Sequence, residues 1–416
     1  MPKIANMEFL IYLTFRCNFH CNMCTQGEEF RKADYNELSA VEWGKLFDDL
    51  TQKIEHPRLV IMGGEPLLHK NFDEFLNLAY KKGLYTHVIT NGALLFDHFD
   101  TIVKTKTTLT LSLHGLENTQ NSITGCKNSF QKTMSALKEI KKISSKNKPF
   151  FHIVNSVVLP ENIEEMKEFT ELICKDKLTH LFLNHPRFVD EKIENETREI
   201  CEKSGFSSSQ KLHLQTNKNY KFDKKYVAEV NEFFNNLNPN RGNFKVVEFP
   251  NFTEEERFLY YGKNFSEIRG KRLCSYPWRV PFILPNGDIA TCLYNTVGNF
   301  TEDNFWKIWG NEKAEKFRKY LQEKGNLPCC KRCTCYYDAN YIFAPQKIIR
   351  LKNGQKLSVS SEMTLVPPSC DGYFVRNIDL PIENDVIPVI PMAFVTEKER
   401  KHIENCEQII AKFSDL

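Results

Sequence analysis

The chain has 416 residues, with 56 Lys and Arg against 53 Asp and Glu, and 41% of its residues are hydrophobic. A chain of this length can bury a large core, and we expect two or three domains. The formal net charge of +3 gives no reason to expect nucleic acid or an anionic membrane as the main partner. The sequence contains no run of eighteen apolar residues and no cleavable signal pattern, so we expect a cytoplasmic protein.

Short β-rich runs alternate with amphipathic helical patterns from residue 9 to about residue 188. Six runs predict strands: 9–15, 58–64, 86–92, 108–114, 151–159 and 180–188. The stretches between them predict helices over 41–54, 72–83, 128–142 and 163–173. Ser39 and Glu42 form a capping-box pattern before the first helix. This alternation favours parallel strands joined by crossover helices, in a doubly wound sheet or in a complete or partial barrel.

The composition changes after the sixth predicted strand. Residues 189–243 are polar and have no clean period, so they predict an insertion with one helix over 224–237. A second unit starts near residue 244, and its Asn286-Gly287 pair between two β runs predicts a hairpin. The pattern that follows predicts a single helix over 304–325.

The last eighty residues differ again from the rest. They are rich in proline, with β-favouring runs over 347–361 and 364–374 and a terminal helix predicted near 396–413. We therefore expect three units, residues 1–243, 244–336 and 337–416. The third unit is a candidate for substrate recognition.

Fourteen cysteines are many for a chain without a secretion signal, and nine of them fall into two groups. The first group follows the first predicted strand and consists of Cys17, Cys21 and Cys24. The second consists of Cys274, Cys292, Cys329, Cys330, Cys333 and Cys335. In a reducing compartment such clustering indicates metal or redox chemistry, whereas the scattered cysteines are expected to behave as small hydrophobic residues.

The first group has three thiols where a structural zinc site needs four ligands. A zinc site would have to recruit His20 or a distant side chain. A cubane iron–sulfur cluster held by three cysteines instead leaves one iron free to bind a small molecule and pass it an electron. The loop after a barrel strand is also where βα folds keep their active sites.

The C-x3-C-x2-C spacing of Cys17, Cys21 and Cys24, with Met23 before the last cysteine, resembles the motif of the radical SAM superfamily. Gly63-Gly64-Glu65-Pro66, at the end of the second predicted strand, resembles that family's GGEP motif. The resemblance implies a [4Fe-4S] cluster that binds S-adenosylmethionine, and a GGEP backbone that receives the methionine ammonium. Glycine at these positions lets the backbone approach a ligand closely.

Three polar residues at later strand ends match positions where members of this family contact the cofactor. They are Asn91, in the sequence Thr90–Gly92, Ser112 after the fourth predicted strand and Asn155 on the fifth. Ser112 and Asn155, taken singly, are equally compatible with ordinary polar residues at the end of a strand.

The second cysteine group resembles the SPASM or twitch extension of a radical SAM subgroup. Cys274, Gly287 and Cys292 have its opening spacing, and Cys330 and Cys333 form the later C-x2-C pair. The resemblance implies one auxiliary [4Fe-4S] cluster on these four cysteines. Cys329 and Cys335 are alternates, which a second cluster would recruit together with Cys370, and a structural zinc site is the alternative to a cluster.

The resemblance also implies an activity. Reductive cleavage of S-adenosylmethionine would give a 5′-deoxyadenosyl radical that abstracts a hydrogen atom from an unactivated C–H bond. The substrate would be a ribosomally made peptide that is crosslinked, given a thioether or epimerised. The alternative substrate is a small polyol, amino sugar or nucleotide-linked metabolite. The first strand begins by residue 9, which leaves no room for an N-terminal leader-recognition domain and weakens the peptide interpretation.

The fate of the substrate radical defines further roles. An auxiliary cluster could accept an electron or anchor the substrate, and Cys370 could donate a hydrogen atom, although a buried or surface thiol is the simpler interpretation. A flavodoxin- or ferredoxin-type protein is the expected reductant. A non-catalytic iron–sulfur or zinc protein is the alternative from another class, but such a protein has no need of GGEP.

Overall fold

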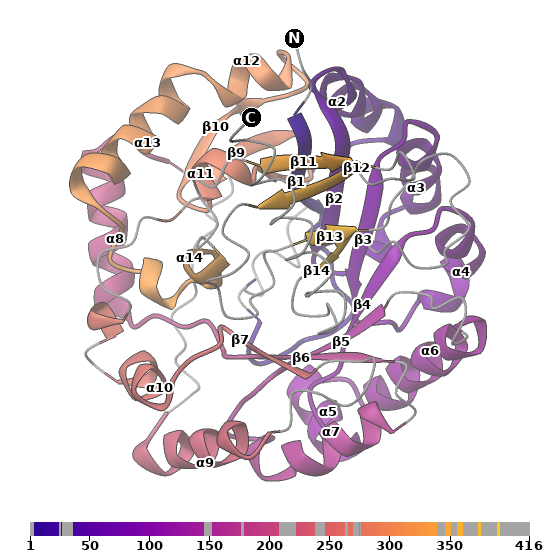
Figure 1. Cartoon of the computed structure of the whole chain (residues 1–416), viewed down its shortest axis with the longest axis vertical. Coiled ribbons are helices and arrows are strands. Elements are labelled where there is room, and N and C mark those ends of the chain that lie inside the picture. Colours follow the sequence, from indigo (N-terminus) through magenta and orange to yellow (C-terminus); the bar gives the residue numbers. More distant parts are fainter. Residues whose placement is uncertain are drawn as a thin grey trace.

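The computed structural model describes most of the chain up to residue 338 and four strands beyond it. The described residues are 4–24, 26, 36–144, 152–175, 179–207, 222–237, 246–262, 265–268, 274, 276–338, 346–350, 356–360, 373–375 and 389–391. One ten-stranded sheet, in the order β10-β9-β8-β1-β2-β3-β4-β5-β6-β7, curves inside an outer ring of helices (Figure 1). This arrangement is the expected α/β fold with a partial barrel.

Seven neighbouring strands of the sheet are parallel, and each pairs with the next along the chain. They are β1 (Ile4–Thr14), β2 (Ile54–Gly63), β3 (Tyr85–Thr90), β4 (Thr108–Ser112), β5 (His152–Val157), β6 (His180–Asn184) and β7 (Val246–Phe249). The first six are the strands predicted from the sequence. The seventh is only four residues long, too short for a clear period, and the sequence analysis missed it.

Nine helices described within the first 261 residues belong to the outer ring around the sheet (Figure 1). They are α2 (Ala40–Lys53), α3 (Phe72–Lys81), α4 (Leu95–Lys104), α5 (Glu117–Thr124), α6 (Ser129–Ile143), α7 (Met166–Cys174), α8 (Glu191–Lys203), α9 (Lys224–Asn235) and α10 (Glu254–Tyr261). The predicted capping box of Ser39 and Glu42 is present at the start of α2. The predicted insertion contains α8 in addition to the expected α9. The sequence did not indicate α8, because its buried face is polar and gives no apolar period.

The sheet continues into the second unit through β8 (Phe282–Ile283), β9 (Asp288–Cys292) and β10 (Asn295–Asn299). β8 pairs in parallel with β1 and antiparallel with β9. The predicted hairpin turn lies between them, and Gly287 has φ of +89°, a conformation that glycine adopts without strain. Because β7 and β8 both pair with barrel strands, one sheet runs across residue 244.

The single helix predicted over 304–325 is wrong, because this segment forms α12 (Phe305–Trp309) and α13 (Glu312–Lys324). Gly310 ends the first helix, and the side chain of Asn311 starts the second by accepting a hydrogen bond from the Ala314 amide at 3.0 Å. Two short helices flank these elements, α11 (Tyr276–Arg279) and α14 (Thr334–Asp338).

The core is continuous between the barrel and the second unit. The ring of Phe9 on β1 lies edge-on against Phe305 of α12, with centroids 5.4 Å apart. Trp43 of α2 contacts Phe300 at the same centroid separation. These two aromatic contacts, Phe9 with Phe305 and Trp43 with Phe300, hold the second unit against the start of the barrel.

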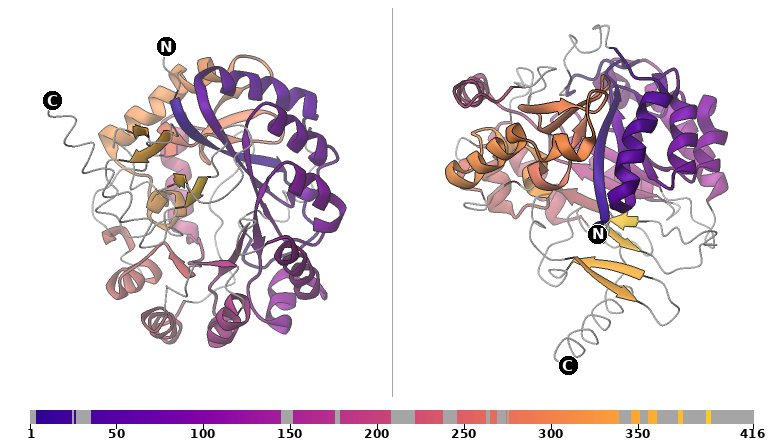
Figure 2. Two further views of the ribbon diagram at one scale, coloured as in Figure 1. Left: turned by 45° about the vertical axis from the view of Figure 1, so that its right-hand side comes forward. Right: turned by 90° about the horizontal axis from the view of Figure 1, so that it is seen from above.

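Beyond residue 345 the structure describes two antiparallel hairpins. They are formed by β11 (Gln346–Arg350) with β12 (Lys356–Ser360), and by β13 (Tyr373–Val375) with β14 (Val389–Pro391). Both lie on the side of the barrel where β1 begins (Figure 2, right). Cys370 and the predicted terminal helix over 396–413 lie outside the described residues. No helix in the described part of the chain is long and apolar enough to cross a membrane.

Candidate active site

The loop that leaves the carboxyl end of β1 carries the three predicted cluster ligands, Cys17, Cys21 and Cys24, and the half-buried Met23. The C-terminal end of α5 holds this loop. The backbone amides of His20 and Asn22 donate hydrogen bonds at 2.9 Å to the carbonyls of Thr124 and Ile123, respectively. The loop is therefore anchored by main-chain contacts that do not use the cysteine side chains.

Two of the three thiols receive backbone hydrogen bonds. The Phe19 amide lies 3.5 Å from Sγ of Cys17, and the Gln26 amide lies 3.3 Å from Sγ of Cys24. Amide donors to sulfur stabilise thiolate ligands and influence the potential of iron–sulfur clusters. The three cysteines are partly exposed, so the donor set and its surroundings fit a cluster with one open iron.

The GGEP segment packs directly against the start of the cysteine loop. The Gly64 amide donates to the Thr14 carbonyl at 2.8 Å, and the Glu65 amide donates to the Arg16 carbonyl at 2.7 Å. A Cβ atom on Gly63 would lie 2.3 Å from the Thr14 oxygen, and one on Gly64 would lie 2.1 Å from the Arg16 oxygen. Glycine is thus required here because the segment approaches the protein's own backbone closely. The sequence analysis considered only a close approach to a ligand and did not identify this reason.

We expect Gly64→Ala to separate the GGEP segment from the cysteine loop, because the nearest obstacle is backbone and cannot rotate away. The expected loss of stability is about 1–3 kcal/mol. Thermal unfolding of the variant measures it. Gly310→Ala is the matched control, since its added Cβ would meet only one atom, at 3.5 Å, and a loss below about 0.5 kcal/mol is expected. Equal losses in the two variants would contradict the role assigned to Gly64.

Glu65 is buried and joins the ends of β2 and β3. Its carboxylate accepts hydrogen bonds from the Thr90 hydroxyl at 2.6 Å, the Asn91 amide at 2.8 Å and the Leu67 amide at 3.2 Å. The Asn91 side chain in turn donates to Oδ1 of Asn18 at 2.7 Å. Asn91 is therefore tied to the cysteine loop. Thr90 and Asn18 were not selected from the sequence, although each is the polar neighbour of a selected residue.

Burial raises the pKa of Glu65 to about 7, although three hydrogen bonds act to lower it. The protonated carboxyl is therefore favoured in the folded state. Its stabilising contribution is complete below the ordinary glutamate pKa and is lost as the pH rises through 7. We expect the stability of the wild type relative to Glu65→Gln to fall by up to about 3 kcal/mol between pH 5 and 8. Denaturant unfolding of both proteins across this range tests the prediction, which a constant or rising difference would contradict.

An ion pair between the exposed Arg16 and the partly buried Glu37 supports the loop. The Arg16 guanidinium donates to both carboxylate oxygens of Glu37, at 2.9 and 2.7 Å, and to the Leu68 carbonyl at 3.0 Å. The Thr14 hydroxyl also donates to Glu37. Burial acts to raise the pKa of Glu37, but the hydrogen bonds from Arg16 and Thr14 outweigh it and hold the pKa below its usual range. Pro66 opens the short 3-10 turn that includes Leu68.

The polar residues predicted at later strand ends lie side by side. The β4–β5 register places Ser112 opposite Asn155. The Asn184 side chain, at the carboxyl end of β6, donates a hydrogen bond to Oδ1 of Asn155. Three neighbouring strands thus present amide and hydroxyl groups at the same edge of the sheet. Asn184 ends the HLFLN strand, and its position alone would have indicated it.

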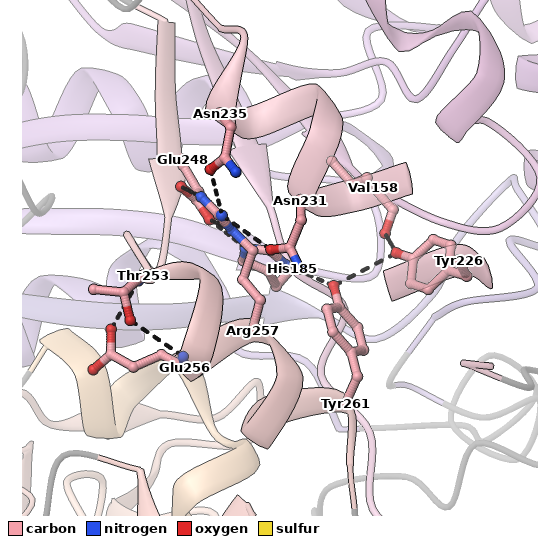
Figure 3. Close-up of polar contacts among 10 residues, drawn as sticks. All are labelled: Val158, His185, Tyr226, Asn231, Asn235, Glu248, Thr253, Glu256, Arg257 and Tyr261. Carbon is pink, nitrogen blue, oxygen red and sulfur yellow. Dashed lines mark hydrogen bonds and ion pairs between the residues drawn. The ribbon is translucent and has the colours of Figure 1, made fainter. Parts of the chain in front are cut away.

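A second polar network begins at the next residue and ties β6 to β7, α9 and α10 (Figure 3). His185 contacts the Tyr261 hydroxyl at 2.6 Å through Nδ1 and Glu248 at 2.8 Å through Nε2. Arg257 pairs with the same carboxylate at 2.7 Å. Burial lowers the pKa of His185 despite the hydrogen bond with Glu248, so the imidazole is neutral at pH 7. We interpret this network as a brace for β7, the last strand of the sheet.

The second cysteine group lines one cavity between β9, α11 and α14. Its six cysteines are Cys274, Cys292, Cys329, Cys330, Cys333 and Cys335. Burial raises the pKa of the Cys292 thiol, against a hydrogen bond from the Tyr294 amide that acts to lower it. The four predicted ligands and the two alternates are all brought together. Such a donor set fits an iron–sulfur cluster.

Helix α8 packs against this cysteine cavity from the predicted insertion. Glu194 accepts a hydrogen bond from the Tyr294 hydroxyl at 2.8 Å, and Tyr294 lines the cavity. Cys201 is buried in the same apolar cluster as Cys329, and burial raises its pKa to about 12. Cys201 was expected to behave as a small hydrophobic residue, and it is buried in this apolar cluster, where it lies beside the second group.

Within the described residues, no three His, Cys, Asp or Glu side chains converge tightly enough to hold a single metal ion.

Comparison with known families defines the class. Residues 11–173 match the model of the Radical SAM superfamily, and residues 274–334 match that of SPASM, an iron–sulfur cluster-binding domain. The chain is a radical SAM protein with a SPASM domain. This membership implies a [4Fe-4S] cluster with S-adenosylmethionine and an auxiliary iron–sulfur cluster.

Curated relatives match over shorter segments. An S-adenosylmethionine-dependent nucleotide dehydratase of Selenomonas ruminantium is 32% identical over 103 residues, which are 22% of this chain and 36% of that protein. The PqqA peptide cyclase of Granulibacter bethesdensis is 33% identical over 89 residues, 21% and 23% of the two chains. The match thus spans about a third or less of either relative.

Solved structures share the fold. Streptococcus suis SuiB bound to S-adenosylmethionine has a TM-score of 0.54 at 16% identity, over 79% of this chain and 72% of that chain. The anSMEcpe protein with bound AdoMet has a TM-score of 0.53 at 15% identity, over 81% and 88%. At this identity the likeness concerns the fold alone.

Proposed function

We propose that this chain reductively cleaves S-adenosylmethionine and abstracts a hydrogen atom from an unactivated C–H bond of a peptide. The outcome would be a crosslink, a thioether or an epimerised residue. The observation that carries the proposal is the hydrogen bond from Gly64 to Thr14, which holds the GGEP backbone beside the three-cysteine loop. A [4Fe-4S] cluster held by Cys17, Cys21 and Cys24 would take an electron from an external reductant and supply it for the cleavage of S-adenosylmethionine into methionine and a 5′-deoxyadenosyl radical.

Different residues of the barrel would bind the cluster and the two ends of S-adenosylmethionine. Three thiolates would hold three irons: Cys17, Cys21 and Cys24. Met23, the backbone of 63–66 and Asn91 would receive the methionine end of the cofactor, and Ser112 and Asn155 would orient its ribose. The hydrogen bonds of Asn91 with Asn18, and of Asn184 with Asn155, support these assignments, because they fix both amides before a ligand binds.

The second group would hold one auxiliary [4Fe-4S] cluster through Cys274, Cys292, Cys330 and Cys333. Cys329 and Cys335 remain the alternates, since all six thiols line the same cavity. This cluster would accept an electron from the substrate or anchor it. Cys370 remains a proposed hydrogen-atom donor on sequence grounds.

The substrates of similar proteins support a peptide substrate for this chain. SuiB has been solved bound to the precursor peptide SuiA, and anSMEcpe with the Cp18Cys peptide. The name of the PqqA peptide cyclase likewise indicates a peptide substrate. The nucleotide dehydratase relative favours a second candidate, a nucleotide-linked metabolite. The same proposal includes a division into three units, with residues 337–416 as a recognition element. It also includes a cytoplasmic location and a flavodoxin- or ferredoxin-type reductant.

Deuterium transfer distinguishes the substrates. Peptides encoded beside the gene are made in deuterated form and incubated anaerobically with the reconstituted protein, S-adenosylmethionine and dithionite. Deuterium in 5′-deoxyadenosine, together with a modified peptide by mass spectrometry, is the expected result. Deuterium taken only from a deuterated nucleotide or polyol would contradict the peptide proposal and leave the radical chemistry intact.

A further inference from the structure

Glu37 connects the two ends of the segment that carries the three cysteines. Thr14 and Arg16 precede Cys17 in the chain, and Glu37 follows Cys24. Oε1 of Glu37 accepts hydrogen bonds from the Thr14 hydroxyl and from Nε of Arg16, the latter at 2.9 Å, and Oε2 accepts one from Nη2 of Arg16 at 2.7 Å. Two parallel hydrogen bonds of this kind fix the relative orientation of a carboxylate and a guanidinium.

The residues that follow Glu37 anchor its backbone. The Leu38 amide donates a hydrogen bond to the Pro285 carbonyl at 3.0 Å, and the Leu38 side chain is buried. The next residue, Ser39, is the N-cap of α2 and forms the capping box there. The carboxylate of Glu37 therefore reaches the cysteine loop from a well-anchored part of the fold.

Hydrogen bonds of Arg16 continue from Glu37 to the GGEP segment. The Arg16 amide donates to Oγ1 of Thr14 at 3.1 Å, so the Thr14 hydroxyl accepts from Arg16 and donates to Glu37. The Arg16 carbonyl accepts from the Glu65 amide at 2.7 Å, and Nη2 donates to the Leu68 carbonyl at 3.0 Å. The amide, the carbonyl and the guanidinium of Arg16 are thus all engaged, and two of these contacts reach GGEP or the turn that follows it.

Loss of the Glu37 carboxylate would disturb this whole set of contacts. Thr14 is buried, and the Glu37 side chain is 10% exposed, so removal of one partner leaves buried polar groups without hydrogen bonds. A shift of Arg16 would carry the Glu65 amide with it and move the GGEP backbone relative to the three cysteines. A displacement of about 1 Å in a binding site can reduce the rate of the reaction about 100-fold.

We propose that Glu37 is a positioning residue that aligns the GGEP backbone with the cysteine loop and thereby sets the affinity for S-adenosylmethionine. The inference rests on the proposed function, because it requires that the cofactor binds between these two segments. Glu37 acts through Thr14 and Arg16, to which its carboxylate is bonded, and has no part in the chemical step.

Hydrogen exchange resolved to single amides in the metal-free full chain measures the alignment without any cofactor. Two variants should speed the exchange of the Arg16 and Glu65 amides about tenfold. They are Glu37→Gln and Thr14→Val, which removes the hydroxyl and keeps the shape of the side chain. Thr14→Ser keeps the hydroxyl and should stay within about twofold of the wild type. Asp48→Asn, which removes an exposed carboxylate on α2, is the control and should leave both amides unchanged.

Binding of S-adenosylmethionine to the anaerobically reconstituted protein is the second measurement. Glu37→Gln should weaken the affinity about tenfold, since the misplaced backbone no longer meets the cofactor correctly. Its iron content should stay at the wild-type value, because the cysteines are unchanged. This split between affinity and iron content separates positioning from a merely structural role, which would lower both.

The outcomes distinguish the inference from the proposed function. Unchanged amide exchange in Glu37→Gln, or a loss of iron in step with the loss of affinity, overturns the inference. Thr14→Ser with the same exchange as Thr14→Val overturns it too, since the hydroxyl would then not be the link. A wild-type protein that retains its iron and binds no S-adenosylmethionine overturns the proposed function, and the inference about affinity with it. The exchange result in the metal-free chain identifies which of the two has failed.

Discussion

Cys24→Ala is expected to abolish S-adenosylmethionine cleavage, with 5′-deoxyadenosine formation reduced at least about 1,000-fold, or about 4 kcal/mol in the barrier. Two thiols remain in the loop, too few to hold a cubane with one open iron. The fold should persist, because His20 and Asn22 hold the loop through main-chain hydrogen bonds. Chromatography of the anaerobically reconstituted variant with dithionite measures the loss.

Cys126→Ala is the matched control for this prediction. Cys126 follows Gly125, whose neighbour in space is His20 of the cysteine loop, yet it belongs to neither cysteine group. We expect the Cys126→Ala variant to cleave S-adenosylmethionine at the wild-type rate. Wild-type cleavage by Cys24→Ala, or an equal loss in both variants, would contradict the assignment of the open cluster.

Cys292→Ala is expected to leave cleavage within about tenfold of the wild type while product formation stops. Cys292 lies at the end of β9 and lines the cysteine cavity, which belongs to a different part of the sheet from the GGEP segment. Iron should fall from about eight to about four per chain, because one of two cubanes is lost. Metal analysis and substrate turnover are measured on the same sample.

Cys201→Ala tests whether the effect of Cys292→Ala is one of packing. Cys201 is buried beside Cys329 but is not a predicted ligand, so its loss should cost about 1 kcal/mol of stability and no iron. Normal substrate turnover by Cys292→Ala would make the second site structural at most. Four irons with zinc in the wild type would exclude the second cluster.

The ligands at strand ends could be predicted from the sequence because parallel βα order fixes their place. Once the strands that precede Cys17 and Gly63 are recognised, both segments must lie at the same edge of the sheet. Hydrophobic periodicity was sufficient to predict six of the strands. It failed for β7, which is too short, and for α8, whose buried positions are Glu194, Thr197 and Cys201.

The contacts that hold the site could not be predicted, because they join residues far apart in the chain. Asn18 and Asn91 are 73 residues apart, and nothing in either segment indicates the other. The glycines of GGEP were recognised, but their packing against Thr14 and Arg16 depends on the β1–β2 register. Likewise, spacing suggested four auxiliary ligands, and only the fold places six thiols on one cavity.

The most direct test of the central claim uses the wild-type protein alone. The chain is reconstituted anaerobically with iron and sulfide, its iron content is verified, and S-adenosylmethionine and dithionite are added. Formation of 5′-deoxyadenosine and methionine in equal amounts is the predicted result. An intact cluster that yields no 5′-deoxyadenosine would contradict the enzymatic account and favour a non-catalytic iron–sulfur protein.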